Sequence, residues 1–253
     1  MVILHTHGHD TGSGEWRPFG CVEDLDIDFT TKDRPALVTM LLASCGSPRE
    51  PEFWWSQAVA VRIVALLRLL ASTESIDHLR LLARCRQPEC MERFEFELPI
   101  AALSDSVPQG DTVQVRLKDE LSIVLRRPNG RDLSEWRNLR PPSRRAAIEA
   151  MLGSLVVEGH ASHEDELALA EALSAQDPLV AFTVSCICPA CGATNEVRVD
   201  LEDIVLDKLR RKQRALVREV HRLASHYGWT EAEVLAIPPH RRTHYLTMIE
   251  SER

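Results

Sequence analysis

Two pairs of cysteines offer the clearest chemistry in this sequence of 253 residues. Cys188 and Cys191 lie in the segment CPACG, which has the form of a zinc knuckle, and Cys85 and Cys90 form another pair far upstream. Zn²⁺ has no preferred d-electron geometry and is well satisfied by four thiolates in a closed tetrahedral site. We therefore predict a structural zinc ion held by these four cysteines. A closed site has no open position for water or substrate, so it would stabilise the fold and not catalyse a reaction.

The segments that follow the two cysteine pairs resemble each other. CMERFEFELPIAAL begins at Cys90 and CGATNEVRVDLEDI begins at Cys191, with apolar residues at corresponding positions. Each segment reads as a knuckle, an alternating strand and the start of a helix. We infer that two neighbouring hairpins bring the pairs together and that the metal joins two distant parts of the chain into one domain.

The first pair departs from the usual pattern. Four residues separate its cysteines, and Met91 stands where the second knuckle has Gly192. The distance between the pairs also far exceeds the roughly 15–20 residues that are common in such sites, so the hairpin and helices between them must be an insertion. Two alternatives remain open: reduced core thiols without a metal, or Cys186 as a substitute ligand. Cys21 and Cys45 read as ordinary buried cysteines.

Composition and charge restrict the class of protein. Hydrophobic residues make up 44% of the chain and charged residues 27%, and the net charge of −8 argues against a dedicated nucleic-acid binder. The longest apolar stretch, residues 58–71, contains two arginines and is too short to span a bilayer. The N-terminal segment lacks the features of a signal peptide. We therefore expect no membrane contact and a reducing compartment.

Periodicity and turn signals predict an α+β fold with a helical N-terminal part, a central zinc-ribbon-like β unit with an inserted hairpin and helices, and a helical C-terminal tail. The parts are an irregular N-terminal arm at 1–30, a helical part at 31–80, the zinc-clamped β unit with its insertion at 81–200, and a C-terminal helical docking region at 201–253. The expected elements are helices at 34–45, 51–72, 143–155, 164–175, 201–227 and 241–249, a strand at 93–100, a hairpin at 111–126 and a turn at 128–130. Gly228 is expected to end the long helix, and TEAE at 230–233 is a capping box that begins a short one.

Short motifs in the last third of the chain carry a family resemblance. They are Asp177-Pro178-Leu179, the CPxCG knuckle, HRLA at 221–224, YGWTEAEVLAIP at 227–238, and the Arg241-Arg242 and Tyr245-Leu246 pairs. Together they resemble the baseplate proteins of contractile phage tails and related injection systems, which are grouped with the T-even-type baseplate hub assembly proteins. The upstream cysteine pair and VLRRPNGRDL are similar to the same group but looser, and the N-terminal arm is not covered.

The resemblance implies a structural or assembly protein without enzymatic activity. Its partners would be other hub or wedge proteins, either in the tail baseplate of a virion or in a cytoplasmic particle assembled in a bacterial host. No small-molecule substrate is expected. Trp, Tyr and Arg dominate protein interfaces, so we predict that Trp229, Arg241, Arg242 and Tyr245 bind a partner. The alternative that Trp229 and Tyr245 only pack a corner between helices remains open.

Two other segments suggest rival functions. HTHGHD at 5–10 resembles the metal-binding HxHxDH run of metallo-β-lactamase-like hydrolases with its last two residues exchanged. A two-metal hydrolase needs further ligands, and the only candidates, His78, His160 and His163, lack the Gly-rich surroundings and strand ends of such folds. Residues 207–222 are basic, which would suit a zinc-ribbon nucleic-acid-binding or regulatory module. Acidic residues interrupt this segment and it contains no aromatic residues for base stacking. A solvated helix face or a contact with an acidic partner is the better interpretation.

Overall fold

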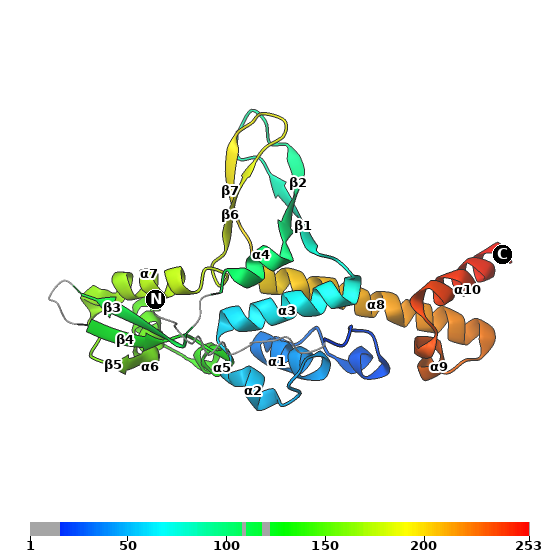
Figure 1. Cartoon of the computed structure of the whole chain (residues 1–253), viewed down its shortest axis with the longest axis horizontal. Coiled ribbons are helices and arrows are strands. Elements are labelled where there is room, and N and C mark those ends of the chain that lie inside the picture. The colour runs from blue at the N-terminus through cyan, green and yellow to red at the C-terminus, as the bar shows by residue number, and fades with distance from the viewer. Residues whose placement is uncertain (1–15, 108–109, 118–121, 253) are drawn as a thin grey trace, which may run out of the picture.

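Two β-hairpins stand on a helical base, and a smaller lobe lies at each end of that base (Figure 1). The computed structural model describes residues 16–107, 110–117 and 122–252. Helices predominate and the sheets are small and antiparallel, which confirms the predicted α+β class with helical N- and C-terminal parts. No helix in these ranges is long and apolar enough to cross a bilayer.

The helical base contains the largest hydrophobic core. Its elements are the 3-10 helix η1 (Val22–Asp26) and the helices α1 (Arg34–Cys45), α2 (Pro51–Ser56), α3 (Val59–Glu74), α4 (Ile100–Asp105) and α8 (Leu201–Tyr227). The helix predicted at 34–45 is confirmed, and the side chain of Asp33 caps it by accepting a hydrogen bond from the amide of Ala36. Helix α3 is buried nearly all round, because α1, α4 and α8 pack against it.

A break near Ala58 divides the helix predicted at 51–72 into α2 and α3. Ala58 pairs with Asn129 in an isolated β-bridge, and the amide of Val59 donates to the carbonyl of Pro128 at 2.9 Å. The prediction of one continuous helix was therefore wrong, because a distant segment supplies hydrogen bonds that replace helical ones.

Arg62 is a fully buried cation at the centre of the base. Its guanidinium donates to the hydroxyl of Thr39 at 3.0 Å and to the carbonyls of Trp54 and Pro35 at 2.7 and 2.8 Å, so it ties together α1, α2 and α3. A Cβ on Gly130 would lie 2.1 Å from this guanidinium. Glycine is therefore needed at position 130 for the close approach. Desolvation lowers the pKa of Arg62 to about 10, which keeps it charged at neutral pH.

The two hairpins have matching structures. The first hairpin consists of β1 (His78–Arg84) and β2 (Arg93–Pro99), in which His78 lies opposite Pro99 and Arg84 opposite Arg93. The second consists of β6 (Thr183–Ile187) and β7 (Thr194–Arg198), in which Thr183 lies opposite Arg198 and Ile187 opposite Thr194. Strand β2 leads into α4 and β7 leads into α8, so the strand-to-helix repeat predicted after each knuckle is confirmed. The helical part predicted for 31–80 ends at Glu74, because the alternating segment that follows forms β1.

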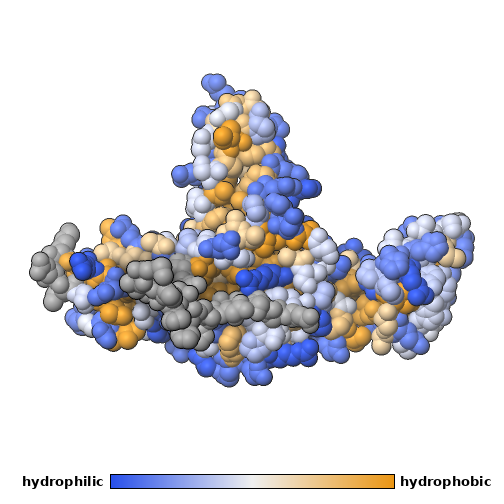
Figure 2. Space-filling view, in the orientation of Figure 1, coloured by the Kyte–Doolittle hydropathy of each residue, from blue (hydrophilic) through white to orange (hydrophobic). Residues whose placement is uncertain are grey.

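The inner faces of the hairpins pack against each other. Ala83, Phe94 and the buried cysteines form a separate small core between them. On the outer faces, Leu82 is 73% exposed and Ile187 is 69% exposed. Figure 2 shows apolar surface along the hairpins, interrupted by hydrophilic residues.

The insertion between the hairpins forms its own lobe with its own core. Its elements are β3 (Thr112–Arg116), β4 (Ser122–Arg126), β5 (Val156–Glu158), α5 (Gly130–Asn138), α6 (Arg144–Leu155), the 3-10 helix η2 (His163–Asp165) and α7 (Glu166–Gln176), and the strand order is β3-β4-β5. The predicted hairpin and both predicted helices are present. The turn predicted at 128–130 is instead the start of α5, because the side chain of Asn129 caps it by accepting from the amides of Arg131 and Asp132.

The C-terminal lobe is the part that the sequence predicted best. Helix α8 has the predicted bounds, Gly228 ends it with a left-handed φ of 69°, and the capping box between Thr230 and Glu233 begins α9 (Glu231–Ala236). Helix α10 (Pro239–Ser251) is slightly longer than expected. The second half of α8 leaves the base and packs against α9 and α10 around a separate apolar core.

Candidate metal centre

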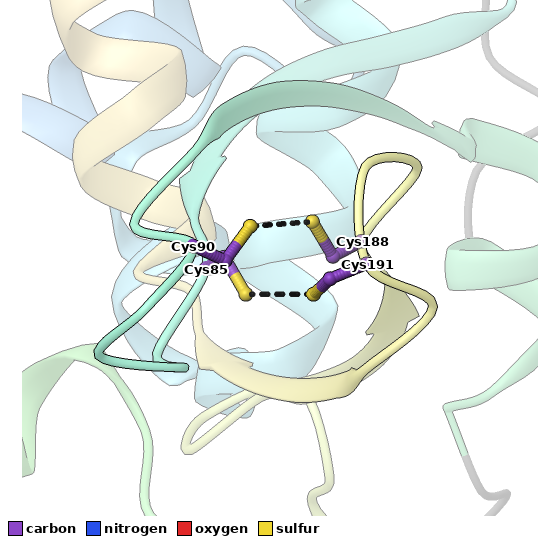
Figure 3. A group of neighbouring side chains, drawn as sticks. All are labelled: Cys85, Cys90, Cys188 and Cys191. Carbon is purple, nitrogen blue, oxygen red and sulfur yellow. Dashed lines mark hydrogen bonds between the residues drawn. The ribbon is translucent and has the colours of Figure 1, made fainter.

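The four predicted cysteines meet at the tips of the two hairpins (Figure 3). Cys85 directly follows β1 and Cys90 lies in the turn before β2, while Cys188 directly follows β6 and Cys191 lies in the turn before β7. All four sulfur atoms lie within 4.8 Å of one another. Two sulfur contacts cross between the hairpins: the sulfurs of Cys85 and Cys191 are 3.6 Å apart, and those of Cys90 and Cys188 are 3.8 Å apart.

These sulfur–sulfur distances fit a tetrahedral metal ion. Bonds of about 2.3 Å from a central ion to four thiolates place the sulfurs roughly 3.8 Å apart at the corners of a regular tetrahedron. A disulfide would need about 2.05 Å, and all seven cysteines are free. The residues therefore provide a four-sulfur site that is compatible with a bound metal and has its ligands already in position.

The turns that carry the cysteines have the same hydrogen-bond pattern. The amide of Cys188 donates to the carbonyl of Ala193 at 2.9 Å, and the amide of Cys85 donates to the carbonyl of Glu92 at 2.8 Å. In each turn, one amide also donates to the carbonyl of the residue four positions earlier. The amide of Gly192 donates to the carbonyl of Cys188 in the second knuckle, and the amide of Met91 donates to the carbonyl of Gln87 in the first. The two knuckles are therefore closely similar despite their different cysteine spacing.

The pKa values of two thiols in the cluster, Cys188 and Cys90, are shifted in opposite directions. Burial raises the pKa of Cys188, but hydrogen bonds from the amides of Cys191 and Ala190 and from neighbouring thiols outweigh this and lower it to about 7. At Cys90 a backbone hydrogen bond from Glu92 lowers the pKa, but desolvation and hydrogen bonds with the other three thiols raise it to about 12. Four thiolates can coexist here only if a cation balances their charge.

Met91 and Gly192 occupy equivalent positions and both have left-handed backbone conformations, with φ of 52° and 74°. This conformation costs a residue with a Cβ roughly 1–2 kcal/mol, while glycine loses about 0.5–1 kcal/mol of extra backbone entropy on folding. A Cβ at Gly192 would meet no atom within 4 Å, so only the backbone conformation matters there.

We therefore expect opposite effects from two reciprocal substitutions. Gly192→Ala should lower the free energy of unfolding by about 1 kcal/mol, and Met91→Gly should raise it by about 0.5 kcal/mol. Denaturant unfolding of the metal-loaded protein measures both. Equal effects of the two substitutions would contradict the shared geometry of the knuckles.

Asn195 joins the two hairpins beside the cluster. It is nearly fully buried, its side-chain oxygen accepts a hydrogen bond from the amide of Arg86 at 2.7 Å, and its nitrogen donates to the carbonyl of Ala193 at 2.9 Å. The same nitrogen lies 3.9 Å from the sulfur of Cys85. Asn195 thus positions the first knuckle from the second hairpin. Its polar character inside an alternating strand was the only signal in the sequence, and we did not identify it there.

The other cysteines lie outside the cluster. Cys186 lies in β6, as expected, and its thiol donates to the carbonyl of Asn195 at 3.5 Å. Cys45 is buried in the base and receives a hydrogen bond from Arg17 at 3.3 Å, whereas Cys21 is only half-buried. The segment HTHGHD lies outside the described residues.

No protein-family model matches the chain, and no curated protein or solved structure matches it either.

The aromatic residues of the C-terminal lobe form one cluster. The ring of Trp229 stacks on that of Tyr227 with centroids 4.5 Å apart, and Tyr245 meets Trp229 edge-on at 5.3 Å. Trp229 and Tyr245 are half-buried, so each packs the corner between helices and also presents part of its ring to solvent. Arg241 is exposed and donates to the hydroxyl of Tyr245 at 3.3 Å.

Arg242 has an internal role and is not available as a docking residue. Its side chain is buried, pairs with Glu219 at 3.0 Å, and donates to the carbonyls of Leu235 and Ile237 at 3.4 and 2.7 Å. These bonds attach α10 to α8 and satisfy the end of α9. Its prediction as a partner-binding residue is therefore corrected, because its neighbours in the fold use its hydrogen-bonding groups.

Proposed function

We propose that this protein is a structural or assembly component of a contractile tail baseplate, without catalytic activity, and that a zinc ion stabilises it. The single observation that carries the structural role is the four-sulfur cluster formed between two hairpins that are far apart in sequence. An ion with four protein ligands has no position for water or substrate, so its effect is on folding. The baseplate assignment is supported by the resemblance of the C-terminal third.

Zinc is the metal that suits this ligand set best. Thiolates favour zinc and iron–sulfur centres over hard cations such as Mg²⁺ and Ca²⁺. Sulfur atoms that all lie within 4.8 Å of one another surround a single ion, whereas a cluster of several irons would hold its thiolates further apart. The knuckle form of the second pair agrees with zinc.

In this proposal the ion fixes the hairpins, and the hairpins fix the base. Strands β2 and β7 lead directly into α4 and α8, both of which contribute to the main core. Helix α8 then extends to the C-terminal lobe, so a rigid base orients the surface that contacts hub or wedge proteins. The location would be the tail baseplate of a virion, or a particle assembled in the bacterial cytoplasm.

The experiment is to measure incorporation into particles. We expect Arg241→Glu to reduce the amount of this protein in purified particles at least tenfold, because the substitution reverses the charge of an exposed cation that contacts Tyr245 at the docking surface. Quantitative mass spectrometry of the particles measures this amount. The thermal midpoint should not change, since the hydrogen bond to Tyr245 is exposed.

Arg131→Glu, which reverses an exposed arginine of the insertion lobe, is the matched control and should leave incorporation unchanged. Trp229→Ala is less informative, because loss of the stacked ring would also destabilise the lobe by about 1–3 kcal/mol. Equal incorporation of Arg241→Glu and the unsubstituted protein would refute docking through this surface. Absence of the protein from particles, and of any effect of its deletion on their assembly, would refute the baseplate role.

A further inference from the structure

Two exposed helical surfaces of opposite charge lie on opposite sides of the hairpins. The first, which we call the arginine stripe, consists of Arg211, Arg214 and Arg218 on α8. The second, the glutamate stripe, consists of Glu164, Leu167 and Glu171 on η2 and α7. In Figure 1, α7 lies on one side of the hairpins, whereas α8 runs beneath them and continues to the other side.

The arginine stripe is free of counter-charges on most of its length. Arg211, Arg214 and Arg218 are exposed and recur at the three- and four-residue spacing of one helix face. Arg211 pairs with Asp207 at 2.6 Å. Arg214 and Arg218 form no ion pair or hydrogen bond with any residue in the described ranges. The opposite face of α8 is fully used, since Leu209 and Leu216 are buried and Gln213 donates to carbonyls of η1 and the residues after it.

The glutamate stripe has the complementary character. Glu164 and Glu171 are exposed, and neither forms an ion pair with another described residue. Leu167 lies between them and is 71% exposed, although α7 buries Leu169 in the core of the insertion lobe. A surface with one exposed leucine between two unpaired carboxylates complements a cationic surface whose side chains have aliphatic stems.

The spacing of the two stripes also matches. Arg211 and Arg218 are seven residues apart on α8, which corresponds to about 10.5 Å along an α-helix, and Glu164 and Glu171 have the same sequence separation across η2 and α7. Two carboxylates can therefore meet two guanidiniums of α8 while Leu167 covers the aliphatic stems of the arginines.

We propose that the glutamate stripe of one copy binds the arginine stripe of the next, so that the chain assembles head to tail. A contact between two different surfaces of identical chains is heterologous and produces a ring or a filament, not an isolated dimer. A nucleic acid would fit the arginine stripe alone, but it would leave the exposed Leu167 and its glutamates unexplained, and the net charge of −8 would repel it. This inference concerns the purified chain by itself and does not depend on the baseplate assignment.

The test uses charge reversal in both stripes, with the oligomeric state measured by sedimentation velocity of the full-length, zinc-loaded protein over a range of concentrations. In 50 mM salt we expect masses that are multiples of 28.5 kDa and that fall as salt is raised. The pair Arg214→Glu and Arg218→Glu should raise the dissociation constant at least tenfold, and so should the pair Glu164→Arg and Glu171→Arg. The chain that carries all four substitutions should associate again, because the complementary charges are restored with their signs exchanged.

Arg93→Glu together with Arg198→Glu is the control for the arginine pair, since it makes the same change in net charge as Arg214→Glu with Arg218→Glu, but on exposed positions of the hairpins. Association that this control weakens equally would overturn the proposal, as would a mass of 28.5 kDa at all concentrations for the unsubstituted protein. Failure of the fourfold variant to associate while it keeps its circular dichroism spectrum would also overturn it. The proposal would also be overturned if the unsubstituted protein bound duplex or single-stranded DNA, and if Arg214→Glu with Arg218→Glu abolished this binding while self-association persisted.

Discussion

Cys188→Ser is expected to remove the metal and to free the two hairpins from each other, while leaving the helical base folded. Cys188 is fully buried in the sulfur cluster, and hydrogen bonds from the amides of Cys191 and Ala190 stabilise its thiolate. A serine hydroxyl is a poor ligand at neutral pH, so only three sulfurs would remain. The unsubstituted protein should contain one zinc ion per chain, and Cys188→Ser should contain less than about a tenth of that amount.

The loss should be large because little else holds the hairpins together. Structural zinc contributes about 10–16 kcal/mol of binding free energy in small zinc domains, whereas an isolated two-stranded hairpin is marginally stable at best. The core between the hairpins is small, and apart from the cysteines it contains chiefly Ala83 and Phe94. Amide hydrogen exchange should therefore accelerate by several orders of magnitude in β1, β2, β6 and β7, and much less in α1, α3 and the second half of α8.

The chain supplies its own matched control in Cys186. This residue lies two positions before Cys188 on the same hairpin, but its thiol donates to the carbonyl of Asn195 and takes no part in the cluster. Cys186→Ser should keep one zinc per chain, and amide hydrogen exchange should remain slow in both hairpins. If Cys186→Ser lost the metal and Cys188→Ser retained it, the ligand set would be wrong. If the unsubstituted protein bound no metal, the thiols would be core residues only.

The parts of the fold that were predictable are those specified by local sequence signals. Helix α8 was predicted with its bounds because its apolar spacing, its Gly228 C-cap and the following capping box are all local. The four cysteines were predictable because the two knuckles repeat a strand-to-helix pattern, and the structure brings those four sulfurs together. Met91 looked unfavourable for a knuckle, yet its backbone adopts the same left-handed conformation as Gly192.

The parts that were missed depend on contacts between distant segments. The break between α2 and α3 arises where Ala58 pairs with Asn129, and neither residue signals this by itself. Strand β1 has alternating apolar residues, but its first three residues, 78–80, follow a helix and were included in the helical part predicted for 31–80. Arg242 has the composition of an interface residue and is nevertheless buried, because Glu219 and two carbonyls accept its hydrogen bonds. Composition alone cannot separate an internal arginine from one that binds a partner.

A buried ion pair at the junction between the insertion lobe and the second hairpin leads to the other large expected effect. Arg127 follows β4 and Asp177 follows α7, and their side chains are only 4% and 3% exposed. The Nε of Arg127 donates to both carboxylate oxygens at 3.0 Å, and its guanidinium also donates to the carbonyl of Gly110 at 3.2 Å. Arg127 belongs to the VLRRPNGRDL motif and Asp177 to the Asp177-Pro178-Leu179 motif, so the pair gives one residue of each motif a structural role.

Asp177→Ala is expected to lower the free energy of unfolding by about 3–5 kcal/mol, because it leaves a buried guanidinium without its counter-charge. Denaturant unfolding measures the loss, and Glu52→Ala, which removes the exposed partner of Arg131, should cost less than about 1 kcal/mol. Replacing both residues, as Arg127→Met and Asp177→Leu, should recover most of the stability, since a buried ion pair can be exchanged for apolar residues of similar size at little cost. A double variant as unstable as Asp177→Ala would mean that the geometry of the pair, and not the uncompensated charge, determines the stability of this junction.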